Sequence, residues 1–109
     1  MELPIFLLND ANGGVSAYHD REMLDAAIIS EEDGRHMTVW GSDGERLVLT
    51  VHPDRWQIAS AEPRASDIEL LRDLLREHLK YRDPATTSRV PRDRIIERAA
   101  AYFKVRKPP

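Results

Sequence analysis

The sequence contains no cysteine, and that absence excludes several kinds of chemistry at once. Disulfide bonds, zinc–thiolate sites and cysteine nucleophiles all require this side chain. No apolar run approaches the ~20 residues of a membrane-spanning helix. The short apolar run at 3–8 follows no basic segment of the kind that begins a signal peptide. We therefore expect a soluble, cytoplasmic protein that does not interact with membranes.

Catalytic and cofactor motifs are also missing. There is no glycine-rich nucleotide-binding loop and no G-x-S-x-G nucleophile motif. The carboxylates stand in no recognisable acid–base arrangement. We expect no enzyme activity, no catalytic residue, no cofactor and no metal site. The four histidines show no H-x-x-x-H spacing and fall in four different predicted elements: His19, His36, His52 and His78.

The charge is distributed unevenly along a chain of single-domain length. Residues 1–82 hold 9 basic and 16 acidic side chains, a net charge of −7. Residues 83–109 hold 7 and 3, a net charge of +4, which leaves the chain at −3. Such asymmetry is typical of an acidic docking face or a basic tail, although uneven solvated surface explains it equally well. Within one domain, 1–109, we expect a core unit at 1–82 and a linker with a basic helix at 83–109.

The stretch 35–82 organises the predicted fold. It reads as three short antiparallel strands followed by one long amphipathic helix that covers them. The Asp-Gly pair at 43–44 lies between two β-rich runs and indicates a hairpin. The His-Pro-Asp-Arg sequence at 52–55 indicates a second tight turn, because proline presets φ and aspartate bonds nearby backbone.

The length of the first hairpin loop decides which residues face each other. A two-residue loop would place Trp40 opposite Leu47. A three-residue loop ending at Gly44 places Val39 opposite Leu47 and Met37 opposite Leu49, and lets Gly44 adopt the left-handed conformation of a G1 bulge. We predict the three-residue loop, with Trp56 as the more buried tryptophan and Trp40 stacked with Arg46. The inner face then carries Met37, Val39, Leu47, Leu49, Val51, Trp56 and Ile58, and the outer face carries His36, Thr38, Trp40, Arg46, Val48, Thr50, Arg55 and Gln57.

The long helix has recognisable ends. Ser66 is predicted to be its N-cap, with Glu69 reaching back in a capping box. The helix is expected to stop at Asp83, because the residue before a proline avoids the α-helical region. Its apolar residues recur at helical spacing: Ile68, Leu71, Leu74, Leu75 and Leu79.

The remaining segments complete an α+β fold. Residues 3–8 and 15–19 are predicted to form a hairpin, and a helix over 21–29 is capped by Asp20. A last helix is predicted over 91–103, after an irregular linker, with Pro91 at its first position. The order is β-β-α-β-β-β-α-α, an antiparallel sheet of about five strands with helices packed on one face. The place of the first two strands in the sheet is left open.

The basic C-terminus has two readings. Basic residues interleaved with Tyr102 and Phe103 could follow a phosphate backbone. Alternatively, the basic helix docks on the acidic body of the same chain. We expect no nucleic-acid binding, but nucleic-acid binding or regulation through this helix is the alternative function. The basic residues are Arg89, Arg92, Arg94, Arg98, Lys104, Arg106 and Lys107.

The organisation of residues 1–82 resembles that of small acidic α+β immunity proteins of bacterial polymorphic toxin systems. The resemblance rests on the hairpin sequence at 40–47, the leucine-rich helix at 67–75, the small size and the missing cysteines. It implies a protein that binds a cognate toxin domain and blocks its active site. The class shares no functional residues, so none is carried over, and the helix after Pro84 lies outside the pattern.

Candidate contact residues follow from charge and side-chain type. Many toxins act on nucleic acids through cationic clefts, and an acidic partner would be steered toward such a cleft. Aromatic residues are enriched among interface hot spots. The alternative for every candidate is ordinary surface, or partial core for Tyr18. The predicted partner contacts are Glu31, Glu32 and Asp33 on an acidic loop, Asp43 and Glu45 at the hairpin end, and Trp40 and Tyr18 as aromatic anchors.

Overall fold

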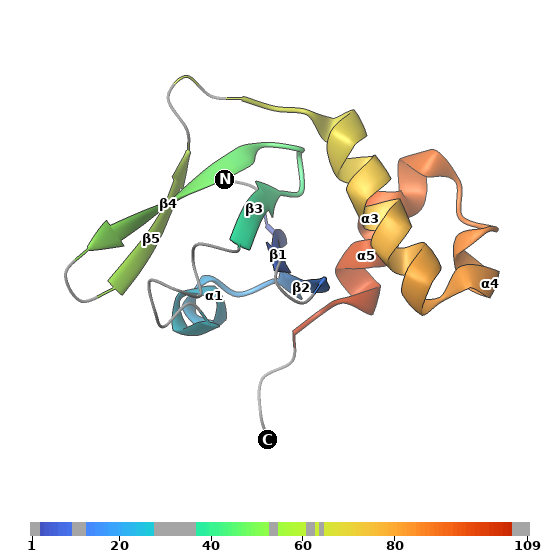
Figure 1. Ribbon diagram of the computed structural model, residues 1–109, viewed down its shortest axis with the longest axis horizontal. Helices are drawn as coiled ribbons and strands as arrows, with labels where there is room; N and C mark the ends of the chain where they lie inside the picture. The colour runs from blue at the N-terminus through green and yellow to red at the C-terminus, as the bar shows by residue number, and fades with distance from the viewer. Residues whose placement is uncertain are drawn as a thin grey trace.

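The chain folds into a five-stranded antiparallel sheet with helices packed against it, which confirms the predicted α+β class (Figure 1). The computed structural model describes residues 3–9, 13–27, 37–52, 55–60, 63 and 65–105, and only the backbone at 25–27, 51–52 and 55–57. The elements are β1 (Ile5–Asn9), β2 (Gly14–Tyr18), α1 (Arg21–Ala27), β3 (Met37–Gly41), β4 (Arg46–His52), β5 (Arg55–Ser60), α3 (Ile68–Arg82), α4 (Pro84–Thr87), the 3-10 turn η1 (Arg92–Arg94) and α5 (Ile95–Tyr102).

The strands lie in the order β2-β1-β3-β4-β5. This arrangement places the N-terminal hairpin beside β3, a question that the sequence left open. Between β3 and β4, Val39 pairs with Leu47 and Trp40 pairs with Arg46. Gly44 has a φ of 87°. Both observations confirm the three-residue loop and the left-handed glycine.

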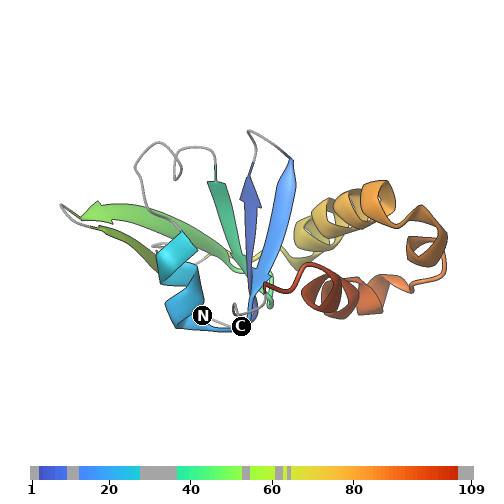
Figure 2. The same cartoon turned by 90° about the horizontal axis from the view of Figure 1, so that it is seen from below.

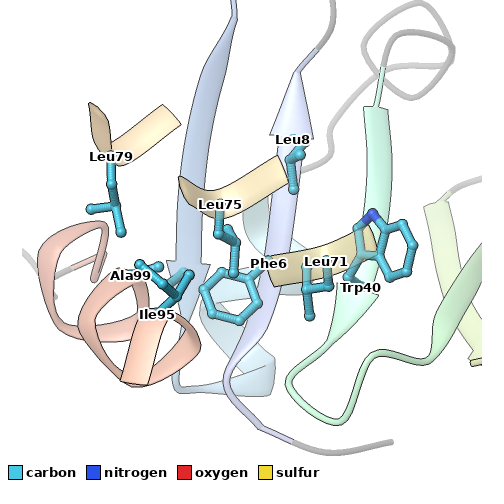
Figure 3. Packing of buried hydrophobic residues seen from close by; sticks show 9 residues of the cluster. Phe6, Leu8, Trp40, Leu71, Leu75, Leu79, Ile95 and Ala99 are labelled. Atoms are coloured by element: carbon cyan, nitrogen blue, oxygen red, sulfur yellow. The ribbon is translucent and has the colours of Figure 1, made fainter. Parts of the chain in front are cut away.

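The two faces of the sheet belong to two different hydrophobic cores. Val39, Leu47 and Ile58 pack with Leu24 of α1. On the opposite face, Trp40 packs beneath α3 and α5, so the helices are divided between the two faces (Figures 1 and 2). The expectation that all helices share one face, with α3 over Val39 and Leu47, is therefore wrong. Figure 3 shows the core under α3 and α5, formed by Phe6, Leu8, Trp40, Leu71, Leu75, Leu79, Ile95 and Ala99.

The cause of this division is visible in β1. Residues Ile5 to Leu8 are all buried, although alternate side chains point to opposite faces. A strand that is buried on both faces reads as a continuous apolar run. Phe6 pairs with Trp40 on the neighbouring strand, so the two rings share a face and require the same cover.

The long helix begins one residue later than predicted. Asp67 is the N-cap, and its carboxylate accepts a hydrogen bond of 3.0 Å from the Leu70 amide. The Ser66 hydroxyl instead donates to the Asp43 carbonyl at 3.3 Å. The helix ends at Arg82, before Pro84, as predicted.

The C-terminal segment is an integral part of the core. Residues 84–87 form a helical turn instead of an irregular linker, and Pro91 precedes the helical residues instead of starting them. Ile95 and Ala99 of α5 are fully buried against α3. Residues 103–105 then lie along β2, where the Ala17 amide donates to the Phe103 carbonyl and the Val105 amide to the Ala17 carbonyl, both at 2.9 Å.

Candidate functional site

Three of the predicted partner contacts are buried. The expectation that Trp40 and Glu45 lie on the surface is wrong, and Tyr18 takes the alternative position in the core. Trp40 and Glu45 are each 1% exposed, and Tyr18 is 8% exposed. Burial raises the pKa of the Tyr18 hydroxyl, and a hydrogen bond with Ser16 partly offsets that shift. Asp43 is exposed. The acidic loop residues Glu31, Glu32 and Asp33 lie outside the described residues, so their role stays a prediction.

Trp40 is a core residue despite its polar neighbourhood. Arg46 lies over its ring, with the guanidinium carbon 4.9 Å from the ring centroid, as the predicted register requires. The indole Nε1 is buried and has no hydrogen-bond partner within the part of the chain that the structure describes. The ring stabilises the packing of β3 beneath α3 and is not available as an anchor for a partner.

The end of the β3–β4 hairpin is hydrogen-bonded to the residues that lead into α3. The Asp67 amide donates to the Gly44 carbonyl at 2.9 Å, and the Arg46 amide donates to the Ala65 carbonyl at 3.0 Å. The Asp43 carboxylate accepts a hydrogen bond of 3.1 Å from the Glu45 amide. Glu45 is therefore fixed in the turn, which explains why only Asp43 of this acidic pair reaches the surface.

The most unusual feature of the sheet is the separation of β3 from β4. The two strands pair over only two residue pairs, whereas β3 pairs with β1 over five and β4 pairs with β5 over six. The predicted pairing of Met37 with Leu49 does not form, because the ladder stops at Val39 and Leu47. In Figure 2, β4 and β5 diverge together from β3. Two-stranded ribbons twist more strongly than wider sheets, which accounts for the divergence.

A cleft of about 350 Å³ lies where the two strands diverge. Most of its lining residues are apolar, and Thr38 and Arg46 are the polar ones. Val48 is 41% exposed, Met37 and Leu49 are half-buried, and Arg46 is exposed at the narrow end. We name this feature the β3–β4 cleft; its lining residues are Met37, Thr38, Val39, Arg46, Leu47, Val48 and Leu49.

A second cleft, of about 410 Å³, lies beside α5 and contains Arg89, Arg94 and Arg98. Arg94 pairs with Glu97 at 2.8 Å, and Arg98 pairs with Asp83 at 3.1 Å. Two of the three guanidinium groups are thus already matched by carboxylates of the same chain. This balance reduces the attraction of the cleft for a phosphate backbone.

Arg92 docks the basic segment on the long helix. It lies 2.7 Å from the Glu69 carboxylate and 2.7 Å from that of Asp73. Its hydrogen bond is the main reason that the pKa of Glu69 is lowered, with Arg72 contributing further. The contacts of Arg92 therefore agree with the alternative in which the basic C-terminal helix docks on the acidic body of the same chain.

A third cleft, of about 590 Å³, separates α5 from the N-terminal end of β1. His19 lies in it, with Nε2 2.9 Å from the Ala100 carbonyl. Asp93 and Glu97 line the same cleft. Across the described ranges, no three histidine, aspartate or glutamate side chains are placed to hold a metal ion. None of the described helices is long and apolar enough to cross a membrane.

Comparisons with known protein families, curated proteins and solved structures find no match for this chain. The choice among the three clefts therefore depends on their chemistry. The clefts at α5 contain charged side chains, of which Arg94, Glu97 and Arg98 already form ion pairs within the chain. The β3–β4 cleft instead combines partly exposed aliphatic side chains with the facing edges of two strands. It is the best candidate for a binding site among the described residues.

Proposed function

We propose that this protein binds and neutralises a partner protein in the manner of an immunity protein, and that the partner is a co-encoded antibacterial toxin domain. The observation that carries the proposal is the β3–β4 cleft. Val48, which is 41% exposed, lines this cleft together with the half-buried Met37 and Leu49. An exposed aliphatic patch rimmed by polar residues is typical of a protein interaction site.

The chemistry of the cleft favours a polypeptide over a small molecule. Pockets for small ligands are concave and bury most of the ligand surface. The β3–β4 cleft is open and is bordered by strand backbone, which presents hydrogen-bonding groups at the spacing of another polypeptide chain. Arg46 at its narrow end belongs to a residue type that is enriched among interface hot spots.

The charge of the chain supports the same partner class. Residues 1–82 carry a net charge of −7, which the +4 of residues 83–109 offsets only in part. A negatively charged surface accelerates association with a cationic active-site cleft and disfavours other acidic partners. Asp43 is the exposed member of the predicted acidic contacts within the described residues. The organisation of 1–82, which resembles that of immunity proteins, is consistent with this role.

Co-expression with the toxin domain tests the proposal. Wild-type protein is expected to restore growth and to elute from gel filtration as a complex with the toxin domain. Val48→Lys should weaken protection, because it places a charge in the aliphatic cleft. Tyr81→Lys is the matched control, since Tyr81 is 85% exposed near the C-terminal end of α3.

The results of this experiment distinguish a wrong function from a wrong binding site. If wild-type protein neither restores growth nor forms a complex, the immunity function is wrong. If it protects and both lysine variants protect equally well, the partner binds elsewhere and the cleft is not the site. Circular dichroism of both variants checks that a loss of protection does not come from unfolding.

A further inference from the structure

We infer that the partner enters the β3–β4 cleft as an extended segment that adds to β4 as a new strand. This inference rests on the proposed function and specifies its binding mode. The cleft is bounded by two strands of one sheet that pair at its narrow end and diverge from there (Figure 2). The exposed edge of a strand is a template for another strand, because its backbone groups are already aligned for ladder hydrogen bonds.

The register identifies the backbone groups that face the cleft. In an antiparallel ladder, successive residues direct their N–H and C=O groups to opposite sides. The Gly41 amide donates to the Glu45 carbonyl across the β3–β4 hairpin, whereas the Arg46 amide points the other way, to Ala65. By this alternation, Leu47 and Leu49 direct their backbone groups toward β3. Met37 directs its own toward β4, and the ladder ends before Met37 and Leu49 meet.

The length of β4 beyond its last pair with β3 favours β4 as the edge that receives the new strand. Past Leu47, β4 continues through residues 48–52. Antiparallel pairing is slightly more stable per residue than parallel pairing. The added strand should therefore run antiparallel to β4, and hence parallel to β3, because β3 and β4 are themselves antiparallel.

The side chains around the cleft specify the sequence character of the added strand. Leu47 and Leu49 face the core that contains Leu24 of α1. Val48 and Arg46 alternate with them on the other face, and no carboxylate among the described residues forms an ion pair with Arg46. The segment should carry apolar residues at alternate positions on the α1 face. An Asp or Glu on the opposite face would pair with Arg46.

A reversible cross-link that closes the cleft tests the inference. Extending the observed register places Thr38 opposite Val48, with both side chains on one face. Non-hydrogen-bonded pairs of this kind have Cα atoms about 4.5 Å apart in a closed ladder, within disulfide range. The chain has no other cysteine. In a Thr38→Cys/Val48→Cys variant, oxidation should therefore lock β3 against β4, and reduction should reopen the cleft.

The expected result is a difference between the two redox forms of this one variant. Oxidation should weaken binding of the toxin domain about tenfold or more, as expected if one or two backbone hydrogen bonds and the aliphatic contacts are lost. Equal binding by both forms would overturn strand addition while leaving the proposed function intact. Failure of the wild type to bind the toxin domain would overturn the proposed function, and strand addition with it.

A second measurement applies even where the disulfide does not form, as judged by counting free thiols. The Leu49 amide points into the cleft, so its hydrogen exchange in the wild-type protein should slow at least tenfold when the toxin domain binds. The Val48 amide, which points toward β5, is the internal control and should change little. An unchanged Leu49 exchange rate in a saturated complex would exclude strand addition.

Discussion

Replacing Gly44 with alanine tests the backbone contact between the β3–β4 hairpin and the start of α3. Gly44 has a φ of 87°, where a side chain strains the backbone. A Cβ atom built there would lie 2.6 Å from the Ile68 Cα and 2.7 Å from the Ile68 nitrogen, at the start of α3. Both neighbours are backbone atoms, so the clash can be relieved only by moving the helix terminus away from the hairpin.

A matched control separates the clash from the strain. Gly13 also has a positive φ, 69°, but nothing lies within 4 Å of a Cβ built on it. Alanine in the left-handed region costs about 1–2 kcal/mol at either site. At Gly44 the shift of α3 also weakens the hydrogen bond from the Asp67 amide to the Gly44 carbonyl, worth about 0.5–1.5 kcal/mol. Gly44→Ala should therefore lose about 1.5–3.5 kcal/mol and Gly13→Ala about 1–2 kcal/mol.

Urea denaturation followed by circular dichroism measures both variants against the wild type. The stabilising effect of alanine on the unfolded chain is the same for both substitutions and cancels in the comparison. Equal slopes of free energy against urea would show that the variants unfold from equally compact states. If Gly44→Ala is no less stable than Gly13→Ala, the hairpin does not hold the start of α3 in the way described.

Three further predictions concern the core, the docked basic segment and the alternative function. Leu75→Ala should lower the free energy of unfolding by about 2–5 kcal/mol, because Leu75 is fully buried. Leu70→Ala, at a 41% exposed position on the same helix, should have a much smaller effect in the same urea assay. The Glu69 pKa is lowered chiefly by Arg92, so their pairing stabilises the fold above the ordinary glutamate pKa and is lost as pH falls through the lowered one. Arg92→Gln should therefore destabilise the protein at about pH 7 more than at about pH 3; an equal effect at both pH values would contradict the pairing. Short DNA and RNA should not bind in fluorescence anisotropy at low salt, and salt-sensitive binding that Arg89→Glu abolishes would favour the nucleic-acid alternative.

Local pattern was sufficient to predict the hairpin and the long helix. Pairing Val39 with Leu47 required a three-residue loop, and Gly44 supplies the positive φ that this loop needs. The strand order depends on long-range pairing of β1 with β3, for which no local pattern exists. The N-cap was misplaced by one residue because Ser66 and Asp67 are both good capping residues, and contact with the hairpin decides between them.

The surface was harder to predict than the fold. The predicted register placed Trp40 on the outer face of the sheet, and Glu45 was predicted to be a partner contact at the hairpin end. Trp40 is buried because α3 and α5 pack over it, and Glu45 is buried where the hairpin end pairs with Ser66. The apolar run of β1 was the available signal that both faces of the sheet are covered. The β3–β4 cleft contradicts the local pattern, because the match of Met37 with Leu49 favours continued pairing. Its origin is the twist of the β4–β5 ribbon, a property of the assembled sheet.

The most direct test of the β3–β4 cleft as the partner site is a hydrogen-exchange map of the wild-type protein with and without the saturating toxin domain. Binding at the cleft predicts new protection in β3 and β4, centred on residues 47–49, with little change at the arginine-containing cleft beside α5. Protection that appears beside α5 or on the outer surface of α3, with β4 unchanged, would contradict it.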